Sequence, residues 1–239
     1  LPLIIYNTLF LKRRSLSWSM YHRIGGKKLF SDSIFFLGSL FSLKTMCYSE
    51  AGARHQLRRR VSPSKIRVVG TAIDEQRIFR VKEALDADSV IDLRAKHNLG
   101  GQFLLLQVMR LTAIKKPELL VDLVENLKSK IDRFILILIG GGDCEGQVKS
   151  LLSARGLDSF VLFVGPIYSE PELAKWFSMS DVFVVPTCIG LSAHHAFAYG
   201  LPVITDSSLT NQASEFEIIE HGYNALIYPE GDIDAFADN

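Results

Sequence analysis

Three cations, Arg110, Lys115 and Lys116, stand close together in the stretch MRLTAIKK and could hold a diphosphate. Arginine offers a planar fork of donors and lysine a point charge, and both suit phosphate oxygens. The cations come after the apolar run FLLLQVM, so they are expected at the carboxyl end of a strand, where open α/β sheets bind ligands. A solvated basic turn is the alternative interpretation.

Two other turns could bring backbone N–H groups to a ligand. The run GGG at 140–142 lets a phosphate or sugar approach closely, which makes Gly141 and Gly142 candidate ligand contacts. It is neither a dinucleotide fingerprint nor a P-loop, and a tight left-handed turn without a ligand is the alternative. The turn GPIY at 165–168 could line a slot for a flat base, with Ile167 as the apolar contact, or could be only a proline turn.

Gly190, Leu191 and Ser192 stand between a predicted strand and a predicted helix. Their N–H groups are therefore expected to point at an anion on the helix N-terminus. His194 and His195 follow, about 100° apart on a helix, so they cannot both face a site, and a packing role is the alternative for either. The helical stretch SAHHAFAYG contains no Cys, Asp or Glu, which leaves a metal site or a nucleophile triad without local support.

The elements that position these residues alternate from Phe103 onward between short apolar runs and amphipathic segments. This alternation is typical of a doubly wound α/β domain with a parallel sheet. The expected strands are 103–109, 133–139, 160–165, 181–186, 202–205 and 225–228. The expected helices are 116–131, 144–156, 170–180 and 192–200.

The first hundred residues are less regular. They predict a strand at 45–50, a helix at 51–60 and a strand at 65–73, followed by a polar connector at 74–102. A domain boundary is expected within that connector. We therefore predict a first domain over 1–85, a linker over 86–102 and a second domain over 103–239.

The composition excludes several classes of protein. The 27 basic and 26 acidic residues leave a net charge of +1, so no global field favours nucleic acid. The 3 cysteines form no C-x-x-C pair, which argues against a disulfide framework or a zinc site and favours a reducing cytoplasm. The longest apolar runs reach about half of the roughly 20 residues that cross a bilayer, so no transmembrane helix is expected. The basic stretch 54–60 could rest on anionic lipid as a peripheral contact, or could be a solvated helix face.

Taken in order, five segments resemble the nucleotide-sugar-binding half of a glycosyltransferase of family 4, with the GT-B fold. They are MRLTAIKKPELLVDL, LILIGGGDCEGQVKSLL, VLFVGPIYSEPELAKWFSMSDVFVVP, HAFAYGLPVIT and NQASEFEIIEHGYNALIYPEGD. The stretches YNTLFLKRRSLSWSMYHR, CYSEAGARHQLRRR and IRVVGTAIDEQRIF resemble the last third of the family's acceptor-side domain. The resemblance implies a fragment with a truncated N-terminal domain.

Residue by residue, the resemblance gives Arg110 and Lys115 the role of the basic pair that stabilises the leaving diphosphate. It places the turn 190–192 against the phosphates and sugar of the donor, and Gly141 and Gly142 beside the nucleotide. The family often carries two glutamates separated by seven residues. Here Thr187 and His195 hold those positions, so the resemblance implies that His195 replaces a glutamate as a partner for sugar or ribose hydroxyls.

The implied reaction moves a sugar from a UDP- or GDP-sugar to a hydroxyl of a lipid-linked or oligosaccharide acceptor, with retention and with no metal or other cofactor. Surface polysaccharide or glycolipid biosynthesis at the cytoplasmic face of a membrane is the expected setting. The chain alone is expected to be inactive without the rest of the acceptor domain. A module that binds the nucleotide sugar without turnover is the alternative; a dinucleotide oxidoreductase is disfavoured because the glycine fingerprint is missing.

Overall fold

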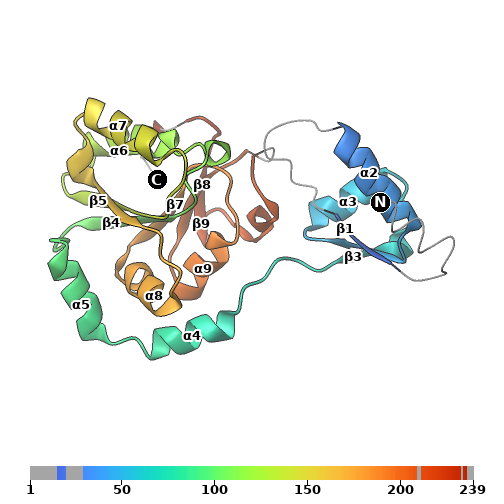
Figure 1. The fold of residues 1–239 in the computed structure, drawn as a ribbon, viewed down its shortest axis with the longest axis horizontal. Helices are drawn as coiled ribbons and strands as arrows, with labels where there is room; N and C mark the ends of the chain where they lie inside the picture. The colour runs from blue at the N-terminus through green and yellow to red at the C-terminus, as the bar shows by residue number, and fades with distance from the viewer. Residues whose placement is uncertain (1–14, 20–28, 209–210, 233, 236–239) are drawn as a thin grey trace. The chain divides into compact units, whose positions relative to one another are not determined.

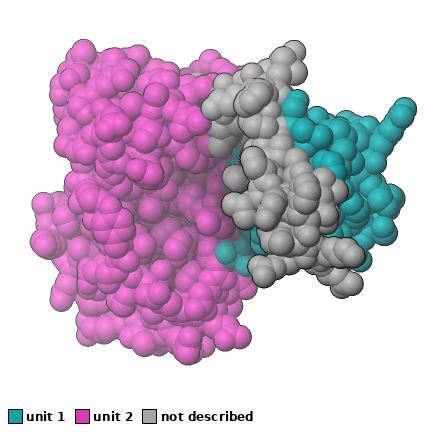
Figure 2. Space-filling model, turned by 45° about the vertical axis from the view of Figure 1, so that its right-hand side comes forward, with its two compact units in different colours: residues 1–72, 210–218 teal, residues 73–209, 219–239 magenta. Residues whose placement is uncertain are grey.

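The computed structural model describes residues 15–19, 29–208, 211–232 and 234–235, so the apolar run at the start of the chain lies outside the described residues. Two compact units are present, and Figure 2 colours them separately. Unit 1 comprises 1–72 and 210–218, and unit 2 comprises 73–209 and 219–239. In the described part, no helix is both long enough and apolar enough to cross a membrane.

Unit 1 is built on a parallel sheet with the order β1-β2-β3. Its elements are β1 (Leu16–Ser19), α2 (Leu29–Phe41), β2 (Lys44–Cys47), α3 (Glu50–Arg58), β3 (Ile66–Val68) and the short 3₁₀ helices Pro63–Lys65 and Ser214–Ile218. The strands and the helix expected between residues 45 and 73 are thus present, although both strands are shorter than predicted. A small core of Cys47, Ala53, Val61 and Ile66 holds the sheet to the helices.

The N-terminus of α3 is capped twice. The Ser49 hydroxyl accepts a hydrogen bond from the Gly52 amide at 3.0 Å. The Glu217 carboxylate, which is distant in sequence, accepts one bond from Glu50 N and one from Ala51 N, each at 2.7 Å. Negative groups satisfy free amides and complement the helix dipole at this end, so residues 210–218 belong to unit 1 for an identifiable reason.

Unit 2 contains a parallel sheet with the order β6-β5-β4-β7-β8-β9. Its strands are β4 (Phe103–Val108), β5 (Phe134–Ile139), β6 (Val161–Gly165), β7 (Val182–Val185), β8 (Val203–Asp206) and β9 (Ala225–Tyr228). Its principal helices are α4 (Glu75–Glu83), α5 (Ala87–Lys96), α6 (Glu118–Lys128), α7 (Glu145–Ala154), α8 (Glu170–Met179) and α9 (Ser192–Tyr199). The expected doubly wound α/β architecture is confirmed, because the strand order reverses direction between β4 and β7.

Helices cover both faces of this sheet: α6 and α7 lie on one side, and α8 and α9 on the other (Figure 1). Strands covered on both faces should be apolar throughout, and β5, with the sequence FILILI, meets this requirement. The buried face of α6 packs with Phe134, Leu136 and Leu138 in the main core. Burial of these apolar side chains, worth about 1.5–3 kcal/mol each, holds α6 against the sheet.

The polar connector expected at 74–102 contains two helices, α4 and α5. Both helices begin at an aspartate cap. The Asp74 carboxylate accepts a hydrogen bond from the Arg77 amide, and the Asp86 carboxylate accepts one from the Asp88 amide. The two helices pack against α8, so the segment 86–102, expected as a linker, is part of unit 2 here. The compact unit begins at Ile73, before the boundary we expected at 85, and the functional domain limits stay a prediction.

Candidate functional site

The turns that follow β4, β5, β6 and β7 border one hollow of about 1020 Å³ in unit 2. It lies at the carboxyl edge of the parallel sheet, where helix N-termini and free amides collect and where open α/β sheets bind ligands. Eight of the residues predicted to bind a ligand line this hollow: Arg110, Lys115, Gly141, Gly142, Ile167, Gly190, Leu191 and Ser192. The structure therefore brings together side chains and turns that are up to 82 residues apart in the sequence, from residue 110 to residue 192.

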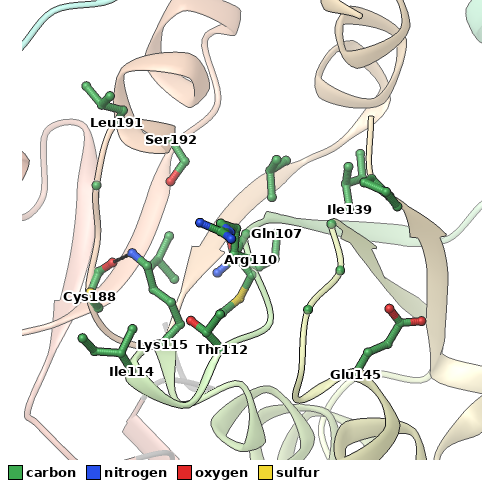
Figure 3. A pocket seen from close by; sticks show the side chains of 18 of the residues that line it. Gln107, Arg110, Thr112, Ile114, Lys115, Ile139, Glu145, Cys188, Leu191 and Ser192 are labelled. Carbon is green, nitrogen blue, oxygen red and sulfur yellow. Dashed lines mark hydrogen bonds between the residues drawn. The ribbon is translucent and has the colours of Figure 1, made fainter. Parts of the chain in front are cut away.

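Two of the three predicted cations line the hollow. Arg110 is exposed just beyond the end of β4, and its guanidinium lies between Ser192 and the glycine turn in Figure 3. Lys115 is half-buried at the end of a 3₁₀ turn, and its ammonium donates to the carbonyl oxygen of Cys188 at 2.6 Å. Lys116 adopts a left-handed conformation and is exposed outside the lining of the hollow. The two positive charges that we expected for a diphosphate thus share one space.

The bond from Lys115 also supports the turn after β7. Cys188 is buried and has a φ of 58°, a left-handed conformation that is costly for a residue with a side chain. An ammonium has three donors, so the bond to the Cys188 carbonyl leaves donors for an anion in the hollow. Lys115 can therefore hold the turn and a ligand at the same time.

The glycine run after β5 has a packing reason as well as a place at the hollow. A Cβ on Gly140 would lie 1.8 Å from the Met109 carbonyl oxygen, and one on Gly142 would lie 2.4 Å from the Leu111 carbonyl oxygen. Both glycines also have positive φ, at 132° and 156°. The two turns after β4 and β5 are therefore in close backbone contact, and the tight-turn interpretation holds for Gly140 and Gly142 whether or not they touch a ligand.

The turn 190–192 opens α9 toward the hollow. The Ala193 amide bonds to the Gly190 carbonyl, and α9 has no side-chain cap hydrogen bond at its start among the described residues. The Ser192 hydroxyl points toward Arg110 (Figure 3). Uncapped amides at a helix N-terminus attract negative charge, so this turn and the two cations provide a positive field in the same hollow.

The turn after β6 supplies Pro166, Ile167 and Tyr168 to the lining of the hollow. Tyr168 is 91% exposed.

Residues 102–239 match the family described as glycosyl transferases group 1. The chain belongs to this family. All of the strands and turns that form the hollow fall inside the matched region. The cations and the turn at the start of α9 therefore lie within the group 1 glycosyltransferase domain of this chain.

Curated relatives are glycosyltransferases by name, and solved structures share the fold. The chain is 28% identical over 155 residues to the amylovoran biosynthesis glycosyltransferase AmsK of Erwinia amylovora, covering 61% of this chain and 37% of the relative. It is 38% identical over 121 residues to a D-inositol 3-phosphate glycosyltransferase of Arthrobacter, covering 46% and 28%. The crystal structure of Anabaena HepE in complex with UDP superposes with a TM-score of 0.78 at 18% identity and covers 98% of this chain and 63% of HepE. The chain thus spans less than two thirds of the length of each of these proteins.

One predicted contact lies elsewhere. His195 was expected to face a hydroxyl in the hollow, but it does not belong to the described lining. Its Nε2 lies 3.0 Å from a Glu170 carboxylate oxygen, and its ring stacks on Phe177 and Tyr199. The Tyr199 hydroxyl donates to the other Glu170 oxygen at 2.8 Å. Burial, and then the bond to Glu170, raise the pKa of Tyr199. These contacts join α9 to α8, and the expected contact of His195 with a sugar or ribose hydroxyl stays a prediction.

Polar residues that were not predicted as ligand contacts also line the hollow, among them Gln107, Glu145 and Thr187. Glu145 reaches the hollow from the first turn of α7 and pairs with Lys149 at 2.7 Å. Gln107 and Thr187 are buried there, at 2% and 3% exposed. A glutamine in the otherwise apolar run FLLLQVM is the signal that could have found Gln107. Among the described residues, no group of three His, Cys, Asp or Glu side chains could hold a metal ion.

Proposed function

We propose that this chain is the donor-binding part of a glycosyltransferase that moves a sugar from a UDP- or GDP-sugar to a hydroxyl group of an acceptor. Family membership and the glycosyltransferase names of the relatives support the proposal. The HepE crystals in complex with UDP and with UDP-glucose support a nucleoside diphosphate sugar as the donor. The observation that carries the proposal is the convergence of Arg110, Lys115 and the turn 190–192 on one hollow.

The proposed chemistry breaks the bond between the anomeric carbon and the oxygen of the diphosphate. The acceptor oxygen forms the new bond to that carbon and releases its proton to water, while the nucleoside diphosphate leaves with one more negative charge. Fixed positive groups accelerate such a step when they stabilise the charge that develops on the leaving group. The guanidinium of Arg110, the ammonium of Lys115 and the amides at the start of α9 are placed for this task.

The proposal also covers the stereochemistry of the transfer, the acceptor and the cellular location. We propose that the anomeric configuration is retained and that the acceptor is lipid-linked or an oligosaccharide in surface polysaccharide or glycolipid biosynthesis. The transfer would take place at the cytoplasmic side of a membrane, with the basic stretch 54–60 as a peripheral contact to the lipid. We also propose that the 239-residue chain alone transfers little sugar. Detectable transfer to a polyprenyl or oligosaccharide acceptor by this chain would contradict that last point.

The proposal is tested by calorimetric titration of the chain with UDP and with GDP. One of the two should bind with millimolar or tighter affinity. Arg110→Ala should weaken that binding by roughly 10- to 100-fold, because a bond to a charged group contributes about 1.5–3 kcal/mol. Lys116→Ala, which removes an exposed charge from the same turn outside the hollow, is the matched control and should bind like the unaltered chain. Absence of nucleotide binding, or a stronger preference for NAD, would contradict the proposal.

A module that binds a nucleotide sugar without turnover is the second candidate. The observation in its favour is that Thr187 and His195 stand where the family resemblance places two glutamates, and that His195 is engaged by Glu170. Joining the chain to a complete acceptor-side domain of a group 1 relative separates the two candidates. Transfer by that chimera supports the enzyme, and tight binding without transfer supports the module.

A further inference from the structure

Two buried oxygen atoms at the hollow have no hydrogen-bond partner in the part of the chain that the structure describes. They are Oε1 of Gln107 and Oγ1 of Thr187. The two side chains are 2% and 3% exposed, and both residues line the hollow. Buried polar groups are nearly always paired, and one left unpaired costs about 1–3 kcal/mol. Two such atoms at one site indicate that a bound molecule supplies their partners.

The positions of the two residues are set by neighbouring strands. Gln107 lies near the end of β4, and Thr187 follows β7 by two residues. The strands pair directly, with Leu105 opposite Val182 and Leu106 opposite Phe183. Gln107 comes one residue after Leu106, whereas Thr187 comes four residues after Phe183, so the two residues line the same hollow at the carboxyl edge of the sheet without being directly opposite each other. An apolar residue at 107 would continue the apolar run of β4, so the glutamine is costly for the fold alone.

The chemistry of these atoms favours a hydroxyl group as the partner. An amide oxygen only accepts hydrogen bonds, whereas a threonine hydroxyl can donate or accept. A phosphate oxygen that carries no proton cannot donate a hydrogen bond to Gln107 Oε1. In the proposed site, Arg110 and Lys115 already provide the positive charges that bind phosphate. A sugar hydroxyl can donate to Gln107 and can either donate to or accept from Thr187. Neither residue carries a charge that would attract a charged sugar.

The order of the strands then orients a nucleotide sugar along the hollow. Ile167 follows β6 at one end, the cations follow β4 in the middle, and Thr187 follows β7. A donor with its base at Ile167 and its diphosphate at Arg110 places its transferred sugar toward β7. We propose that Gln107 and Thr187 bind hydroxyl groups of the transferred sugar and so contribute to the selection of a neutral hexose. This inference rests on the function proposed above.

The first test measures the stability of the chain without ligand. Gln107→Met and Thr187→Val keep the size of each side chain and remove the unpaired atom. Each variant should have a higher melting temperature than the unaltered chain, because the cost of burying an unpaired polar atom is gone. Gln147→Met, on the exposed face of α7, is the control and should leave the melting temperature within about 1 °C. A lower melting temperature for both buried-site variants would show that these atoms bond within the protein, and would overturn the inference.

The second test compares the affinity for donors with the affinity for the matching nucleoside diphosphates. The probes are UDP, UDP-glucose, UDP-N-acetylglucosamine, GDP and GDP-mannose. For a donor that binds more tightly than its diphosphate, Gln107→Met and Thr187→Val should each reduce donor affinity by roughly three- to tenfold and leave diphosphate affinity within about twofold.

The outcomes of the second test separate the two proposals. If the unaltered chain binds neither the diphosphates nor the donors, the proposed function itself fails. If it binds them and the variants lose donor and diphosphate affinity equally, or lose neither, only the role of Gln107 and Thr187 is overturned. A chain that binds no donor more tightly than its diphosphate would overturn that role as well.

Discussion

The ammonium nitrogen of Lys115 lies 2.6 Å from the backbone carbonyl oxygen of Cys188, and it thereby joins the turn after β4 to the turn after β7. The Cys188 residue is held in a left-handed conformation with a φ of 58°. A single side chain thus fixes the two turns that supply the cations and the helix N-terminus of the proposed donor site. Lys115 therefore has a structural task in addition to its proposed contact with phosphate.

Lys115→Met should affect both tasks. The substitution keeps most of the aliphatic stem and removes the ammonium, so nucleotide affinity should fall by about tenfold and the free energy of unfolding by about 1–3 kcal/mol. Arg110→Ala should lower the affinity without that loss of stability, because the Arg110 side chain is exposed. Calorimetric titration and urea unfolding measure the two effects. Equal stability of Lys115→Met and the unaltered chain would show that the bond to Cys188 contributes nothing.

Gly140→Ala should destabilise the chain strongly. The added Cβ would lie 1.8 Å from the Met109 carbonyl oxygen, and the φ of 132° is unfavourable for any residue with a side chain. We expect a loss of more than about 3 kcal/mol in urea unfolding. Gly146→Ala, in α7 with no atom within 4 Å of the new Cβ, should instead stabilise the chain by about 0.5–1 kcal/mol. A neutral result for Gly140→Ala would mean that the two turns can separate at little cost.

His195→Ala should reduce stability while leaving nucleotide affinity unchanged. The substitution removes the bond to Glu170 and the stacking on Phe177, which together contribute about 1–3 kcal/mol. The melting temperature and the affinity for UDP or GDP are measured on the same protein. A loss of affinity for UDP or GDP at an unchanged melting temperature would instead show that His195 contacts the ligand.

The stability of the chain should fall as the pH rises above about 9. The pKa of Tyr199 is raised in the folded state, chiefly by burial, so this tyrosine keeps its proton in the folded chain while it ionises near pH 10 in the unfolded chain. Its contribution is therefore complete below the unfolded pKa and is lost as the pH rises through the folded value. Tyr199→Phe should reduce the slope of unfolding free energy against pH between 9 and 11 by up to about 1.4 kcal/mol per pH unit. Tyr168→Phe, at a position that is 91% exposed, is the control and should leave the slope unchanged.

The sheet of unit 2 could be predicted from the sequence because its strands are predominantly apolar and the intervening helices are amphipathic. The helices α4 and α5 were not predicted, since they are rich in charged residues and bury only Ile78 in α4 and no residue in α5; their caps at Asp74 and Asp86 were the available signal. The turns that line the hollow were predictable because they follow strands. The pairing of His195 with Glu170 was not, because it depends on how α8 and α9 pack.

The central claim is that Arg110, Lys115 and the turn 190–192 bind one diphosphate. Amide ¹H–¹⁵N spectra of the labelled chain, recorded during titration with UDP and with GDP, test it most directly because they detect even millimolar binding. The account predicts that Gly190, Leu191 and Ser192 are among the residues with the largest shifts, and that Arg110→Ala raises the nucleotide concentration at which these shifts are half complete by roughly 10- to 100-fold. Largest shifts outside the carboxyl edge of the unit 2 sheet, or no shifts with either nucleotide, would contradict it.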